Sequence, residues 1–138
     1  MDEQNYYRVS IKGIVIDDKD RILLSLEDNG MWEMLGGGLD HDEDPIDCLT
    51  REIHEETGLT VTYISPSPKY FVSCKRQNSK YYIANVIYEI RLKDLLFTPS
   101  DECQELRFFS LDEMRQVELF PNVKKLLEFL DKQQSQSG

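Results

Sequence analysis

The sequence has little positive charge and no long apolar run. Its 138 residues include 16 lysines and arginines against 26 aspartates and glutamates, which gives a formal net charge of -10. Binding polymeric nucleic acid or an anionic membrane requires clustered basic side chains, so the composition disfavours both partners. No run of 18 apolar residues is present to span a bilayer. A small anionic substrate fits this composition only if metal ions screen its charge.

Cysteine is also scarce, and its spacing excludes two kinds of site. Cys48, Cys74 and Cys103 are odd in number and form no Cys-x-x-Cys pair, which argues against a disulfide framework and a zinc site. The first five residues are acidic and polar, whereas a secretory signal is basic and then apolar. We therefore predict reduced thiols in a cytoplasmic protein.

The length and apolar content suit one domain, which we place at residues 1–131, followed by a flexible Gln- and Ser-rich tail at 132–138. Apolar patterning predicts strands at 7–16, 21–26, 32–35, 59–64, 69–74, 80–92 and 105–109, and helices at 45–57, after 110 and after 121. The first two strands are expected to form a hairpin across a polar turn. Three glycines at 36–38 predict a loop that allows close backbone approach.

The helix at 45–57 has the clearest boundaries. Asp44 suits the N-cap, Pro45 suits the first helical position, and Gly58 can end the helix in a left-handed conformation. Apolar residues at helical spacing predict its buried stripe, namely Ile46, Leu49 and Ile53. A second capping pattern, Ser110 with Glu113, predicts the start of a short helix.

The region from Asp40 to Glu56 is strongly acidic, with eight carboxylates and a single Arg51. Glu52, Glu55 and Glu56 fall together on one helical face, where their repulsion opposes folding. Many helices carry a solvated acidic face, so this clustering alone does not establish a binding site. A hard divalent cation such as Mg²⁺ would nevertheless turn the repulsion into attraction, because it prefers carboxylate oxygens.

The complete pattern is more specific than the acidic face. The fixed positions fit G-x5-E-x7-R-E-U-x-E-E-x-G-U, where U is a bulky apolar residue, at Gly37, Glu43, Arg51, Glu52, Ile53, Glu55, Glu56, Gly58 and Leu59. This spacing resembles the signature of the MutT/Nudix hydrolase family. The resemblance implies an α/β fold, an α/β/α sandwich with a central mixed sheet. It also implies hydrolysis of a nucleoside diphosphate linked to another group, with Mg²⁺ or Mn²⁺ as cofactor.

The resemblance assigns roles to matching residues. The implied metal ligands are the carboxylates of Glu52, Glu55 and Glu56 and the carbonyl of Gly36. Arg51 would orient the glutamates through ion pairs, and Glu43 would stabilise the junction between loop and helix. Bound metals could then neutralise the diphosphate and lower the pKa of an attacking water.

Outside the signature, the loop before the late strand often supplies a general base or further ligand in this family. Glu102 is the best match and Glu105 the second, although an exposed loop acid explains either residue. Asn122 lies where some members place an amide that contacts the base, and a helix N-cap explains it equally well. His41 and His54 are expected at the surface, and a ligand role for either is disfavoured because no cysteine pairs with them at zinc spacing.

Features that would identify the substrate are missing. The first choice is a small nucleoside triphosphate or an oxidised nucleotide, because the chain is short; ADP-ribose or another nucleotide sugar follows. A non-catalytic nucleotide-binding module is the rival class, but it would be expected to lack one of the glutamates. The resemblance implies a small nucleotide partner and, since many members are dimers, it leaves a homodimer open.

Overall fold

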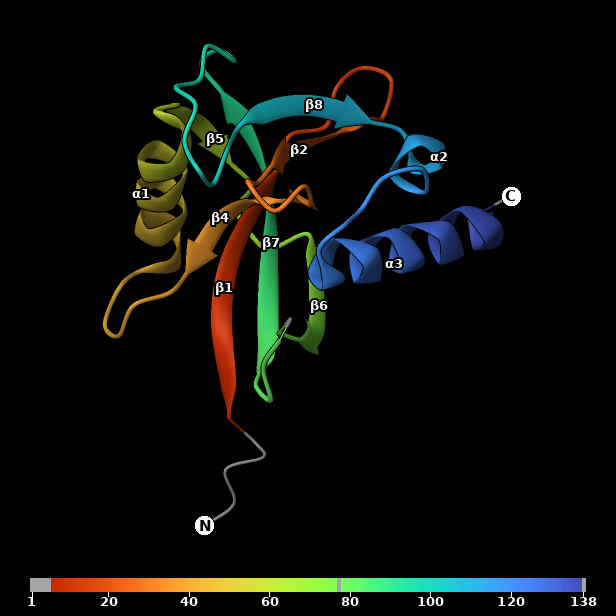
Figure 1. Cartoon of the computed structure of the whole chain (residues 1–138), viewed down its shortest axis with the longest axis horizontal. Helices are drawn as coiled ribbons and strands as arrows, with labels where there is room; N and C mark the ends of the chain where they lie inside the picture. Colours follow the sequence, from red (N-terminus) through yellow and green to blue (C-terminus); the bar gives the residue numbers. More distant parts are fainter. Residues whose placement is uncertain (1–5, 77, 138) are drawn as a thin grey trace.

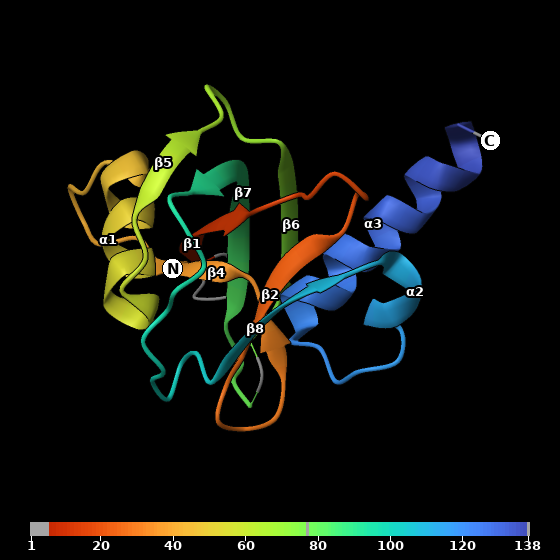
Figure 2. The same cartoon turned by 90° about the horizontal axis from the view of Figure 1, so that it is seen from above.

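The computed structural model describes residues 6–76 and 78–137, and its central feature is a mixed sheet between two helices. The elements are β1 (Tyr7–Ile14), β2 (Ile22–Leu26), β3 (Trp32–Glu33), β4 (Leu35–Gly38), α1 (Pro45–Thr57), β5 (Val61–Ile64), β6 (Tyr70–Lys75), β7 (Tyr82–Leu92), β8 (Glu105–Phe109), α2 (Leu111–Met114) and α3 (Pro121–Ser137). Helices α1 and α3 lie on opposite sides of the sheet (Figures 1 and 2). The predicted α/β/α architecture is therefore confirmed.

The long strand β7 is the centre of the main sheet, as the sequence predicts. It pairs in parallel with β1 and antiparallel with β5 and β6, while β4 pairs with the other edge of β1. Side chains alternate between the two faces. Ile11 and Tyr88 pack in the core under α1, whereas Val72 and Ile87 pack in the core under α3.

The hairpin predicted for the first two strands forms beside its turn but does not continue along β1. Ile16 and Ile22 form an antiparallel bridge, and the N–H of Leu23 donates to the carbonyl oxygen of Val15 at 3.0 Å. Along β1 itself both edges are occupied, by β4 and β7, so β2 joins a second sheet in the order β3-β2-β8. The residues between β1 and β2 carry the chain from one sheet to the other, and Ile14 and Ile22 share one apolar core.

The glycine segment is also different from the expected loop, because it forms strand β4 along β1. Gly36 has a φ of 113°, and a Cβ there would lie 2.2 Å from the carbonyl oxygen of Ile11. Glycine is therefore required at this position, because any side chain would collide with the paired strand β1. The close backbone approach predicted for the segment occurs within the sheet.

Helix α1 has the predicted ends. The side chain of Asp44 accepts a hydrogen bond from the backbone N–H of Ile46, and Gly58 adopts a left-handed conformation with φ of 75°. Leu49 and Ile53 are fully buried as expected. Ile46 is not, because 39% of it is exposed at the first turn, and Cys48 is buried.

The last two helices begin where the local sequence predicts them. The predicted capping box of Ser110 and Glu113 is present at the start of α2. Helix α3 begins at Pro121 and continues through Ser137, so residues 132–137 extend the helix where the sequence predicts a flexible tail. Residue 138 and residues 1–5 lie outside the described residues. Across the described part of the chain, no helix combines the length and apolarity needed to cross a bilayer.

Candidate active site

The site forms where the last turns of α1 meet strand β4. The backbone N–H of Gly36 donates a hydrogen bond of 2.8 Å to the Glu56 carboxylate, which is only 8% exposed. Burial raises the pKa of Glu56 to about 8, although Lys12 and the N–H of Gly36 oppose the shift. Glu56 is thus a buried acid held against the strand backbone.

Glu52 lies one helical turn earlier and rests on Gly37. A Cβ at Gly37 would lie 2.5 Å from one oxygen of the Glu52 carboxylate, well inside van der Waals contact. The helix and the strand therefore approach closely at two successive glycines. This contact explains why a residue without a side chain is needed at Gly37.

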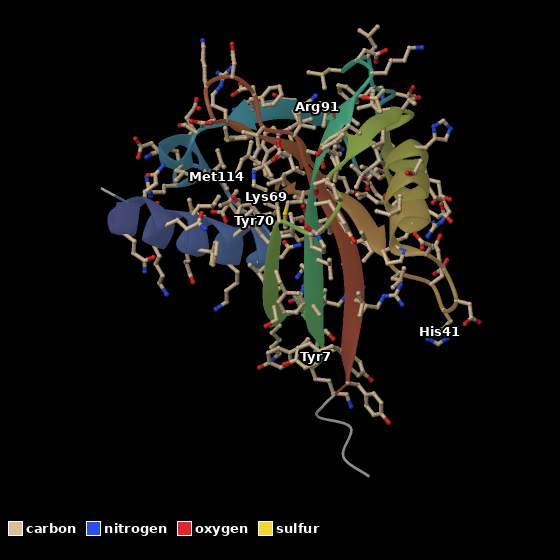
Figure 3. All side chains as sticks on the ribbon, turned by 180° about the vertical axis from the view of Figure 1, so that it is seen from behind. Tyr7, His41, Lys69, Tyr70, Arg91 and Met114 are labelled. Carbon is tan, nitrogen blue, oxygen red and sulfur yellow. The ribbon has the colours of Figure 1, made fainter. Side chains whose placement is uncertain are left out.

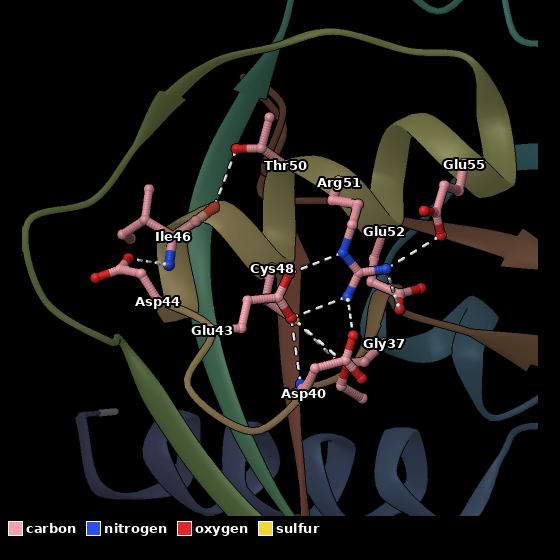
Figure 4. A network of polar contacts seen from close by, with 11 residues as sticks. Gly37, Asp40, Glu43, Asp44, Ile46, Cys48, Thr50, Arg51, Glu52 and Glu55 are labelled. Atoms are coloured by element: carbon pink, nitrogen blue, oxygen red, sulfur yellow. Dashed lines mark hydrogen bonds and ion pairs between the residues drawn. The ribbon is translucent and has the colours of Figure 1, made fainter.

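Arg51 organises the outer part of the site (Figure 4). Its guanidinium donates to both oxygens of Glu43, at 2.8 and 2.9 Å, and to Glu52 and Glu55 at 3.1 and 3.2 Å. Asp40 lies 3.5 Å away. Hydrogen bonds from Arg51 lower the pKa of Glu43 to about 2. The paired hydrogen bonds also join the loop that contains Glu43 to helix α1, which contains Arg51.

Lys12 is a site residue that the sequence analysis missed. Its Nζ donates to the carbonyl oxygen of Gly36 at 3.0 Å and lies 3.7 Å from a carboxylate oxygen of Glu33. Only 6% of Lys12 is exposed. The available signal was the alternation of polar Ser10 and Lys12 with apolar Ile11 along β1, which indicates a polar face.

The loop before β8 is fastened to the end of α1, close to the glutamates. The hydroxyl of Ser100 donates to the backbone carbonyl of Glu56 at 2.8 Å. The neighbouring Glu102 is exposed, and its charge contributes to raising the pKa of Glu56. Glu105 instead pairs with Arg107 at 3.0 Å. This placement favours Glu102 over Glu105 as the candidate base.

The ligand types suit a hard divalent cation, but the side chains are engaged elsewhere. Among the described residues, no three His, Cys, Asp or Glu side chains already stand in an arrangement that could hold a metal ion. Arg51 pairs with Glu52 and Glu55, and Lys12 binds the Gly36 carbonyl. Carboxylate and carbonyl oxygens are nevertheless the ligands that Mg²⁺ prefers. The oxygen atoms of these residues are therefore of the type that binds Mg²⁺. Binding a metal would require Glu52, Glu55 and the Gly36 carbonyl to give up or share their present contacts with Arg51 and Lys12.

A cavity of about 360 Å³ has Glu33 and Glu27 in its wall. Lys75 and Arg76 also line it, so it offers both charge signs to a ligand. Neither this cavity nor a larger one of about 640 Å³, lined by residues from β1, β2, β6, α2 and α3, includes a residue of the region 37–59 in its wall. The smaller cavity is connected to the glutamates through Glu33, because Glu33 lies 3.7 Å from the Lys12 ammonium that binds the Gly36 carbonyl. We therefore take the smaller cavity as the candidate ligand cavity.

Asn122 lines the smaller cavity and is 5% exposed. Its amide donates to the side-chain oxygen of Asn85 at 3.1 Å, and its own oxygen accepts the N–H of Val123 at 2.9 Å. The helix begins one residue earlier, at Pro121. Asn122 is therefore not the N-cap that the sequence analysis offered as its alternative role.

Comparison with known proteins decides the family, because a family model described as the NUDIX domain matches residues 6–132. The chain belongs to the Nudix family. A MutT-like protein of Streptomyces ambofaciens is 43% identical over 56 residues, covering 40% of this chain and 36% of that protein. The chain spans about a third of the length of three curated relatives that it matches, this one included.

Two solved structures share the fold of this chain. The E. coli ORF135 protein is 27% identical, with a TM-score of 0.68, over 88% of this chain and 86% of that one. An ADP-ribose pyrophosphatase from Streptococcus suis 89-1591 is 26% identical, with a TM-score of 0.62, over 89% and 91% of the two chains. Both likenesses extend over most of the domain.

Other residues considered from the sequence lie outside the Nudix site or fill its core. His41 and His54 are exposed as expected, and Figure 3 shows His41 on the loop before α1. Cys48 is buried with its Sγ 3.5 Å from the carbonyl oxygen of Gly38, and burial raises the pKa of its thiol to about 11. The three cysteines are unpaired and buried. Among the aromatic residues, Tyr70 packs on Phe129, whereas Phe71, Tyr81 and Tyr82 are exposed.

Gly37→Ala tests the contact between the Nudix signature strand and helix. The new methyl group would collide with the Glu52 carboxylate, so we expect a loss of roughly 1 to 3 kcal/mol of stability and weaker metal binding. Chemical denaturation and calorimetric metal titration would measure both effects. Gly30→Ala is the control for metal affinity, because nothing lies within 4 Å of its Cβ; its φ of 83° makes some loss of stability expected there from backbone strain alone. Equal metal affinity in the two variants would contradict the role of the Glu52 contact.

Proposed function

We propose that this Nudix protein is a hydrolase that uses Mg²⁺ or Mn²⁺ to cleave the pyrophosphate linkage of a nucleoside diphosphate joined to another group. The observation that carries the proposal is the meeting of α1 with β4. There the buried Glu56 binds the Gly36 backbone, and Glu52 rests on Gly37. This junction concentrates hard oxygen ligands. Lys12, which binds the Gly36 carbonyl, lies 3.7 Å from Glu33 in the wall of a cavity with room for a small ligand.

The roles of the residues follow from their contacts. Glu52, Glu55 and Glu56, with the Gly36 carbonyl, would hold the metal, which when bound neutralises phosphate charge and lowers the pKa of a coordinated water. Arg51 orients Glu52 and Glu55 by direct ion pairs. Glu102 would accept the proton of the attacking water, since its loop is fastened beside Glu56 by Ser100.

A small nucleoside triphosphate or an oxidised nucleotide is the first choice of substrate. The cavity of about 360 Å³ is near the lower limit for ligand sites, and its mixed wall offers three amides, two acids and two bases for contacts with a nucleotide. The likeness to a protein named ADP-ribose pyrophosphatase supports ADP-ribose or another nucleotide sugar as the second candidate.

A panel of nucleotides with Mg²⁺ or Mn²⁺ tests the proposal directly. The panel should include ordinary and oxidised nucleoside triphosphates, ADP-ribose and nucleotide sugars, with released phosphate, pyrophosphate and nucleoside monophosphate as the readouts. We expect metal-dependent turnover of at least one member, highest for a triphosphate. Binding without turnover across the panel would instead identify a non-catalytic nucleotide-binding module. Chelation of the metal is the matched control for each active nucleotide.

A further inference from the structure

Lys12 places a positive charge inside a site whose other side chains are mainly acidic. Strand pairing fixes this position, because Lys12 is the register partner of Gly36 in the antiparallel pair of β1 and β4. The side chain is 6% exposed, and its ammonium binds the Gly36 carbonyl at 3.0 Å and approaches Glu33 at 3.7 Å. A buried ammonium in such surroundings stabilises the nearby carboxylates.

The surrounding charges keep Lys12 protonated. Burial lowers its pKa, but the carboxylates of Glu33, Glu56, Glu27 and Glu52 raise it, and the net shift is upward. Both backbone polar groups of Gly36 are hydrogen-bonded to these charged side chains. The N–H of Gly36 binds Glu56 while its carbonyl binds Lys12.

We propose that Lys12 is a resident cation of the metal site, which occupies the Gly36 carbonyl in the metal-free protein and leaves it when a divalent metal binds. This inference rests on the proposed function, which assigns that carbonyl to the metal. Two cations near one carbonyl repel strongly in a partly buried site. A lysine has a flexible four-carbon stem that allows its ammonium to withdraw. Lys12 thereby stabilises the acidic site before metal arrives and lowers its affinity for the metal.

Calorimetric titration of metal-free protein with Mn²⁺, without any nucleotide, tests the competition. Lys12→Met keeps the buried stem at similar length and removes the charge. We expect this variant to bind Mn²⁺ at least about tenfold more tightly than wild type. We also expect a lower melting temperature without metal and a larger rise on adding it. Lys69→Met is the control, since Lys69 pairs with Glu89 at an exposed position outside the described site, and its metal affinity should match wild type.

Unchanged or weaker Mn²⁺ binding in Lys12→Met would overturn the proposal. A second measurement avoids dependence on a variant that fails to fold. In wild-type protein, the NMR signal of the Lys12 side-chain nitrogen should shift when Mg²⁺ is added, while that of Lys69 should stay in place. A Lys12 signal that does not move at saturating Mg²⁺ would also overturn it. Neither measurement requires turnover, so an inactive protein that passes both would refute only the proposed hydrolysis.

Discussion

Glu56→Gln is expected to lower kcat by roughly 1000-fold or more while the protein stays folded. Glutamine can still accept the hydrogen bond from the Gly36 N–H, so the contact between α1 and β4 is kept. The negative charge needed for a divalent metal is lost. Metal ions contribute several kcal/mol to stabilising phosphoryl-transfer transition states, and each 1.4 kcal/mol corresponds to tenfold in rate. The large decrease in kcat is therefore expected from the loss of one negative charge, while the side chain keeps its shape and its hydrogen bond to Gly36.

Steady-state kinetics on the best substrate of the nucleotide panel would measure this loss, with circular dichroism and thermal melting to establish that the variant is folded. Asp47→Asn is the matched control, because it removes one carboxylate from the first turn of the same helix. Its kcat should stay within about twofold of wild type. If Glu56→Gln retained most of its activity, Glu56 would have no part in the reaction.

Helix α1 could be predicted from the sequence because its determinants are local. Asp44 and Gly58 specify its ends through hydrogen bonds and dihedral preferences within a few residues. Periodicity also identified the face that contains Leu49 and Ile53, but it gives no information on where the covering sheet ends along the helix. Ile46 was therefore assigned to the core although it is substantially exposed.

The pairing of strands could not be predicted in the same way. Local preferences predict the turn between β1 and β2, but how far the hairpin extends depends on β4 and β7, which pair with β1 and come later in the sequence. The role of Lys12 has the same origin, because its contact with Gly36 arises from the register of β1 with β4. Helical spacing accounts for the Arg51 pair with Glu55, since the two residues lie at i and i+4. It does not account for the contact of Arg51 with its neighbour Glu52, which only the family resemblance implied.

Raising the pH from about 5 to about 8.5 is expected to destabilise the metal-free protein. Burial raises the pKa of Glu56 to about 8 and that of Glu27 to about 7, both above the ordinary value of 4.5. In this window the folded protein holds protons that the unfolded chain has released, so stability is lost as pH rises through the folded pKa values. The low pKa of Glu43, about 2, affects stability only under more acidic conditions. We expect the melting temperature to fall by roughly 5 to 15 °C.

Thermal melts in chelator at several pH values, with wild type and Glu56→Gln compared, would measure the effect. The variant cannot ionise at position 56, so its melting temperature should fall less, and Glu27 should account for the remaining fall. Saturating Mg²⁺ should remove most of the wild-type decrease, because a bound cation favours the ionised carboxylates. Parallel curves for the two proteins would show that Glu56 is already ionised at pH 5. If Glu56 binds the metal as proposed, its proton release and metal binding are coupled, and metal affinity should increase with pH over the same range.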